Sequence, residues 1–158
     1  VYLPMETLDA PAAESIRRIA EPAQQAPQLV MVVEDEEMLR DLSVTMLEAE
    51  GYRVIVAKDG QEALEVFELH RDEIGLVVCD LGLPKLSGRD VFLKMKKSRP
   101  GVRVIVASGY LEPRVRSEIL QAGVLDTIQK PYDFRDMIGK IRAIIGPAVR
   151  SEQEPQLF

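Results

Sequence analysis

Five short runs of apolar residues alternate along the chain with five segments of helical periodicity, and this alternation restricts the fold most. The apolar runs are rich in β-branched residues and span residues 29–33, 53–57, 76–79, 102–107 and 127–129. The helical patterns span residues 37–50, 61–69, 89–98, 114–121 and 134–145. Strands that alternate with helices over short connections build a parallel sheet with helices on both faces. The sequence therefore predicts a doubly wound α/β domain with a five-stranded parallel sheet.

Composition limits the class of protein. The 158 residues are 46% hydrophobic, which fits one domain with trailing sequence and leaves no room for a second full domain. A net charge of -6 argues against a surface for nucleic acid or anionic membrane. No apolar segment approaches the roughly 18 residues of a membrane span. The single Cys79 lies in an apolar run, as expected of a buried residue in a reducing compartment. We expect a cytoplasmic domain.

Candidate site residues follow the first, third, fourth and fifth predicted strands. Glu34 and Asp35 come after the first strand, Asp80 after the third, Ser108 after the fourth and Lys130 after the fifth. Taken singly, each has a simpler explanation as a turn former or an exposed lysine. Because the carboxyl ends of parallel strands meet at one edge of the sheet, where open α/β sheets bind ligands, we expect one crevice to contain them all.

The residues after the first strand exclude a common kind of site. A phosphate loop would place GxGxxG or GKS/T there, whereas this chain has four acids in succession at residues 34–37. Glu36 and Glu37 are explained by the positive end of the following helix dipole. Glu34, Asp35 and Asp80 together require a counter-ion, and oxygen ligands of this kind suit Mg2+. A carboxylate nucleophile, a hard cation, a hydroxyl and a lysine indicate phosphoryl chemistry.

Residues 28–146 resemble the receiver domain of two-component response regulators in four motifs. These are VVEDEE at 32–37, DLGLPKLSG at 80–88, VASGY at 106–110 and QKPY at 129–132. The resemblance implies a flavodoxin-like (βα)5 fold with strand order 2-1-3-4-5. It also implies that the domain catalyses transfer of a phosphoryl group from a partner's phosphohistidine to its own aspartate, with Mg2+ as cofactor, and then changes conformation.

The motifs assign the acids by position. The resemblance makes Asp80 the phosphoacceptor and Glu34 and Asp35 the acid pair that holds Mg2+. Asp80 and the backbone carbonyl of Gly82 complete the ligand set that the family implies. A haloacid-dehalogenase type of enzyme also uses a strand-end aspartate with Mg2+, but it needs a second acid where this chain has Gly82. That class is therefore disfavoured.

The other two strand ends supply the expected response to phosphorylation. By resemblance, Ser108 binds the incoming phosphoryl group, Lys130 pairs with it, and the Lys130-Pro131 peptide bond is cis. The family usually has Tyr or Phe where this chain has Thr127, so the usual coupling between the hydroxyl and a ring on the fifth strand is in question. Tyr110 is the alternative ring. A receiver-like binding module that is never phosphorylated remains the alternative function, although it would be expected to lack a site residue.

The flanking segments indicate a place in a larger protein. Residues 1–4, VYLP, resemble the closing strand of a histidine kinase ATP-binding domain, and residues 5–28 have linker composition. We therefore expect residues 1–27 to end a kinase domain and its linker, residues 28–146 to form the receiver and residues 147–158 a tail. This suggests the C-terminal receiver of a hybrid kinase, with a membrane-anchored sensor as one arrangement. The expected partner is a histidine kinase or a histidine phosphotransfer protein, and the expected state is a monomer or weak dimer.

Overall fold

The computed structural model describes residues 28–148, which form a single five-stranded parallel sheet in the order β2-β1-β3-β4-β5. The strands are β1 (Leu29–Val33), β2 (Arg53–Ala57), β3 (Ile74–Asp80), β4 (Val104–Ser108) and β5 (Asp126–Gln129). The helices are α3 (Glu37–Ala49), α4 (Gly60–Leu69), α5 (Gly88–Ser98), α6 (Pro113–Gln121) and α7 (Phe134–Ile145). This confirms the flavodoxin-like (βα)5 fold and the expected strand order.

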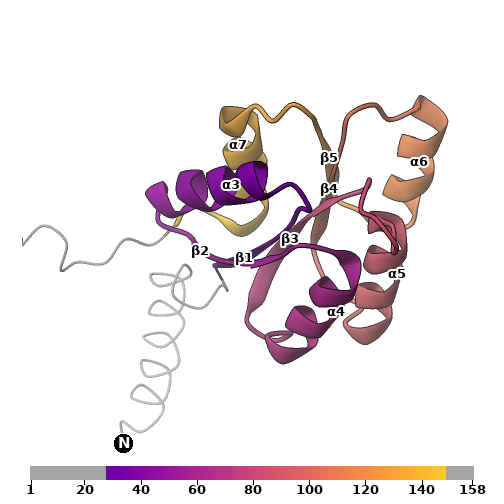
Figure 1. Ribbon diagram of the computed structural model, residues 1–158, viewed down its shortest axis with the longest axis horizontal. Coiled ribbons are helices and arrows are strands. Elements are labelled where there is room, and N and C mark those ends of the chain that lie inside the picture. Colours follow the sequence, from indigo (N-terminus) through magenta and orange to yellow (C-terminus); the bar gives the residue numbers. More distant parts are fainter. Residues whose placement is uncertain (1–27, 149–158) are drawn as a thin grey trace, which may run out of the picture.

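The helices cover both faces of the sheet (Figure 1). Side chains of α4, α5 and α6 pack against one face, and side chains of α3 and α7 pack against the other. Strand β1 is buried on both faces of the sheet. Met31 belongs to the first of these cores, and Val30 and Val32 belong to the second. A strand buried on both sides reads as a continuous apolar run, as LVMVV does.

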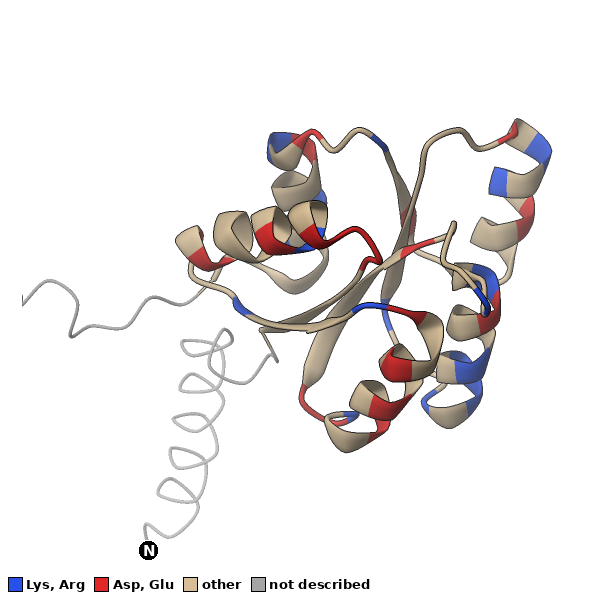
Figure 2. Cartoon of the chain, in the orientation of Figure 1, with Lys and Arg blue, Asp and Glu red and all other residues tan. Residues whose placement is uncertain are grey.

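Local signals fix where three of the helices begin. The carboxylate of Asp59 accepts from Glu62 N at 2.8 Å and starts α4, and the hydroxyl of Ser87 accepts from Asp90 N at 3.2 Å and starts α5. Asp133 caps α7 in the same way. Each cap satisfies a backbone N–H at a helix end that has no partner within the helix. Figure 2 shows acidic residues along α4 and basic residues along its neighbour α5.

The starts of two strands differ from the sequence prediction by two residues, and the other strand ends agree to within one residue. Strand β3 begins at Ile74 and not at Leu76, because Ile74 pairs with Leu29 of β1 although Gly75 interrupts the apolar run. Strand β4 begins at Val104 and not at residue 102, because Val102 N donates to Arg99 O and closes the turn after α5. Both changes keep the carboxyl ends of the strands at the expected edge.

Several expectations concern residues that the structure does not describe. The predicted kinase remnant and linker, residues 1–27, lie outside the described residues, and of the predicted tail only residues 147 and 148 are described. Among the described helices, none has the length and apolarity needed to cross a membrane.

Candidate functional site at the carboxyl edge of the sheet

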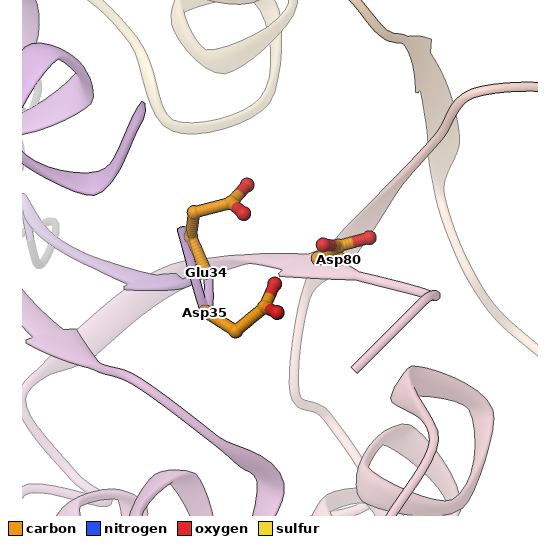
Figure 3. Close-up of side chains that lie close together, drawn as sticks. All are labelled: Glu34, Asp35 and Asp80. Atoms are coloured by element: carbon orange, nitrogen blue, oxygen red, sulfur yellow. The ribbon is translucent and has the colours of Figure 1, made fainter. Parts of the chain in front are cut away.

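Three carboxylates meet where β1 and β3 end. Oxygen atoms of Glu34, Asp35 and Asp80 all lie within 4.8 Å of one another, and Figure 3 shows the three side chains converging. Glu34 is 0% exposed and Asp80 4% exposed, whereas Asp35 is exposed. Three oxygen donors with one side open to solvent fit a hard divalent cation that keeps some of its water. The structure thus brings together the acids that the sequence singled out.

Lys130 provides a positive charge inside this group. Its Nζ lies 3.1 Å from Asp80 Oδ2 and 3.3 Å from Glu34 Oε1, and its side chain is 19% exposed. Burial alone would lower the pKa of Lys130, but the hydrogen bond to Asp80 and the charges of Asp80 and Glu34 outweigh it. The pKa of Lys130 therefore lies above its ordinary value of 10.5. We refer to Glu34, Asp35, Asp80 and Lys130 as the acid site.

Lys130 reaches the acids from the loop after β5. The Lys130-Pro131 peptide bond is cis, as the sequence analysis expected. Lys130 N donates to Ser108 O at 2.9 Å, which fixes the start of this loop beside β4. The loop thereby brings a cation from the fifth strand to the ends of the first and third strands.

Tyr132 also belongs to the site, although the sequence analysis gave it no role. Its hydroxyl donates to Glu34 Oε1 at 2.7 Å. Burial, this hydrogen bond and the charge of Glu34 raise the pKa of the Tyr132 hydroxyl, so the group is a neutral donor. The only sequence signal was its place in QKPY after Lys130, which does not reveal that the hydroxyl reaches Glu34 at the end of β1.

The loop after β3 holds the other side of Asp80. Gly82 N donates to Asp80 Oδ1 at 2.9 Å, so the two carboxylate oxygens of Asp80 have different partners. Gly88 at the start of α5 packs so closely that a Cβ there would lie 2.3 Å from Asp80 O. The role of the Gly82 carbonyl as a metal ligand stays a prediction.

The ends of β4 and β5 are arranged differently. Ser108 Oγ donates to Tyr110 O at 2.9 Å, and the side chain of Tyr110 is 73% exposed. Thr127 Oγ1 accepts from Arg116 Nε at 3.2 Å, and Thr127 O accepts from Lys140 Nζ at 2.6 Å. Beside them is a pocket of about 210 Å³, which we call the β4–β5 pocket. It is lined by Ser108, Tyr110, Leu111, Arg116, Thr127, Ile128 and Gln129.

A family model of the response regulator receiver domain matches residues 30–142 of the chain. The chain belongs to this family. The match includes both ends of the acid site, from Glu34 to Lys130, and also Tyr132. The receiver domain is thus the unit that carries the acid site and the β4–β5 pocket.

Curated relatives are longer than this receiver domain. Response regulator RR06 of Streptococcus pneumoniae serotype 2 is 37% identical over 116 residues, which are 73% of this chain and 52% of that protein. The chain therefore spans about half the length of the curated relatives that it matches.

Solved structures share the fold. A receiver domain protein from Clostridium thermocellum is 27% identical with a TM-score of 0.71, over 74% of this chain and 93% of that chain. Response regulator protein TrrA from Thermotoga maritima, solved in complex with Mg2+ and BeF, is 26% identical with a TM-score of 0.65. That alignment covers 74% of this chain and 98% of the other.

Proposed function

We propose that the receiver domain accepts a phosphoryl group on Asp80 from a phosphohistidine, in a reaction that requires Mg2+. The observation that carries this proposal is the position of Lys130 Nζ, 3.1 Å from Asp80 in a group of three carboxylates within 4.8 Å. A carboxylate nucleophile beside a fixed cation suits phosphoryl transfer, in which positioning and charge stabilisation supply most of the catalysis. The likeness to TrrA, solved with Mg2+ and BeF, supports the choice of metal.

Each residue has a defined part in the reaction. A carboxylate oxygen of Asp80 attacks phosphorus, and the new O–P bond forms as the P–N bond of phosphohistidine breaks, with the electron pair left on the imidazole nitrogen. Gly82 N holds Asp80 Oδ1 at 2.9 Å and so orients the nucleophile. Lys130 pairs with the transferred phosphoryl oxygens. Glu34, Asp35, Asp80 and the Gly82 carbonyl would hold Mg2+, which when bound neutralises charge on the phosphoryl oxygens.

The response follows from new hydrogen-bond demands at the end of β4. A phosphoryl group adds three acceptor oxygens, and Ser108 is the hydroxyl assigned to them. To donate there, Ser108 Oγ leaves Tyr110 O, its present partner at 2.9 Å, and this frees the loop after β4. Because Thr127 puts no ring in the β4–β5 pocket, the exposed ring of Tyr110 is the aromatic side chain placed to fill it.

The proposed partner is a histidine kinase or a histidine phosphotransfer protein. The family match supports this choice, because a phosphohistidine donor is what the resemblance implies. We further propose that the receiver works in the cytoplasm as part of a hybrid kinase, because residues 1–4 resemble the closing strand of a histidine kinase ATP-binding domain and residues 5–28 have linker composition.

Incubation with acetyl phosphate tests the chemistry without a partner. The protein is incubated with and without Mg2+, and intact mass is measured for the wild type and for Asp80→Asn. A phosphoryl-sized gain that requires Mg2+ and is lost in Asp80→Asn supports the proposal. No gain in folded wild-type protein would contradict it and would favour the receiver-like binding module.

A further inference from the structure

Glu34 is the most buried acid of the site, and several donors surround it. Its carboxylate is 0% exposed. Oε1 accepts from the Tyr132 hydroxyl at 2.7 Å and lies 3.3 Å from Lys130 Nζ. Oε2 accepts from Glu36 N at 3.2 Å, with Lys130 Nζ at 3.5 Å. The shortest of these contacts is the one from Tyr132.

A buried carboxylate that loses a donor must find another, because an uncompensated buried charge is costly. For Glu34 that replacement is Lys130, which already lies against Oε1. Lys130 is shared, since its Nζ also donates to Asp80 Oδ2 at 3.1 Å. The Tyr132 hydroxyl therefore supplies a hydrogen bond to Glu34. Without it, Lys130 would be drawn toward Glu34 and away from Asp80.

The ring of Tyr132 is itself well fixed. It packs against Phe134, with ring centroids 5.7 Å apart, and it is partly buried against the core that α3 and α7 cover. Lys130 Nζ lies 5.6 Å from the centroid of the Tyr132 ring, so the same side chain contacts both the cation and the acid. A donor held in this way restricts the rotamers of the group that it contacts.

We propose that Tyr132 is a positioning residue of the receiver domain, which holds the Glu34 carboxylate in place for the metal and leaves Lys130 on Asp80. This rests on the proposed function, because it assigns Glu34 to the metal site. Hydrogen-bond partners of metal ligands commonly tune metal affinity. The contact also depends on the length of Glu34, since an aspartate at this position is one methylene shorter and would withdraw its carboxylate from the hydroxyl.

A double-mutant cycle on Mg2+ affinity tests this inference without any phosphodonor. The wild type, Tyr132→Phe, Glu34→Asp and the double variant are titrated with Mg2+, and the shifts of backbone amides in residues 80–88 are followed by NMR. We expect Tyr132→Phe to weaken Mg2+ binding about tenfold in the wild type. In the Glu34→Asp background, the same substitution should change the affinity less than about twofold, because the hydroxyl no longer contacts the carboxylate.

Tyr52→Phe is the matched control. Tyr52 is buried, and its hydroxyl donates to Gly146 O at 2.7 Å, away from the acid site. This variant should bind Mg2+ as the wild type does, although it too loses a partly buried tyrosine hydrogen bond. Thermal unfolding of each variant verifies that it is folded before titration.

The outcomes separate the inference from the proposed function. Unchanged Mg2+ affinity in Tyr132→Phe, or an equal loss in both backgrounds, overturns the positioning role while wild-type phosphorylation still stands. If the wild type neither binds Mg2+ nor gains a phosphoryl group from acetyl phosphate, the proposed function fails and this inference fails with it. A tenfold loss confined to the Glu34 background supports the inference.

Discussion

The acid site and the β4–β5 pocket lie at the same edge of one sheet but are built in different ways. In the acid site, Lys130 contacts two carboxylates at 3.1 and 3.3 Å, and both carboxylates are almost fully buried. In the β4–β5 pocket, the hydroxyls of Ser108 and Thr127 contact a backbone carbonyl and an exposed arginine. One region pairs buried charges, and the other makes partly exposed hydrogen bonds around a space of about 210 Å³.

This difference follows from the cost of desolvation. A buried charge is stable only where an opposite charge and hydrogen bonds compensate it, so the side chains of the acid site have few alternative positions. A partly exposed hydroxyl can exchange its partner for water at little cost. Under the proposed function, the chemistry therefore belongs to the acid site, which has one arrangement, and the response to phosphorylation belongs to the β4–β5 pocket, which can take another.

Removal of the positive charge of Lys130 should have the largest effect. In Lys130→Met, Asp80 and Glu34 keep their burial and lose their counter-ion, so the free energy of unfolding should fall by about 3 kcal/mol at pH 8. Chemical denaturation measures the change. Mg2+ should restore part of it, because a bound cation stabilises the folded state. Lys94→Met, at an exposed position on α5, is the control and should change stability by less than about 0.5 kcal/mol.

The difference in stability between the wild type and Lys130→Met should depend on pH. Because the folded pKa of Lys130 is above 10.5, its contribution is complete below pH 10.5 and is lost as the pH rises further. The difference between the wild type and Lys130→Met should therefore narrow above pH 10.5. A difference that is independent of pH, or smaller than about 1 kcal/mol at pH 8, would show that the cation does not hold the acid site together.

Substitution of Gly88 should have a smaller effect. A Cβ at Gly88 would lie 2.3 Å from Asp80 O and 2.7 Å from Leu81 Cα, so Gly88→Ala should destabilise the domain by about 2 kcal/mol. It should also slow phosphoryl uptake, because the strain acts on the backbone of Asp80. A Cβ at Gly139 on α7 would have no atom of another described element within 4 Å, so Gly139→Ala should be neutral or stabilising by about 0.5 kcal/mol. Thermal unfolding measures both variants, and equal stabilities of Gly88→Ala and Gly139→Ala would contradict this prediction.

The smallest effect is expected in the β4–β5 pocket. Thr127→Val removes the acceptor of Arg116 and keeps the shape of the side chain, so the free energy of unfolding should change by less than about 0.5 kcal/mol. Mg2+ affinity, measured by the NMR titration, should stay at the wild-type value. If this variant lost as much stability as Lys130→Met, the two regions would be equally constrained and the contrast between them would be wrong.

The elements and most of the acid site could be read from the sequence because their signals are local. LVMVV must be buried on both faces, and a parallel sheet then brings the residues after each strand to one edge. The sequence pattern alone therefore predicted one crevice for Glu34, Asp35, Asp80, Ser108 and Lys130. The structure confirms that the three acids and Lys130 meet. Ser108 instead donates to Tyr110 O and lines the β4–β5 pocket. The start of β3 was wrong because its partner, Leu29 on β1, is distant in sequence.

Only the tertiary structure decided which donor each buried oxygen receives. Tyr132 and Glu34 are 98 positions apart, and their 2.7 Å contact depends on the path of the loop after β5 and on the rotamers of both side chains. The contact between Arg116 and Thr127 likewise depends on how α6 packs beside β5. Periodicity and motifs specify which residues reach an edge of the sheet. A hydrogen bond also requires a particular distance and angle between two atoms, so the partners are set by the packing of the whole domain.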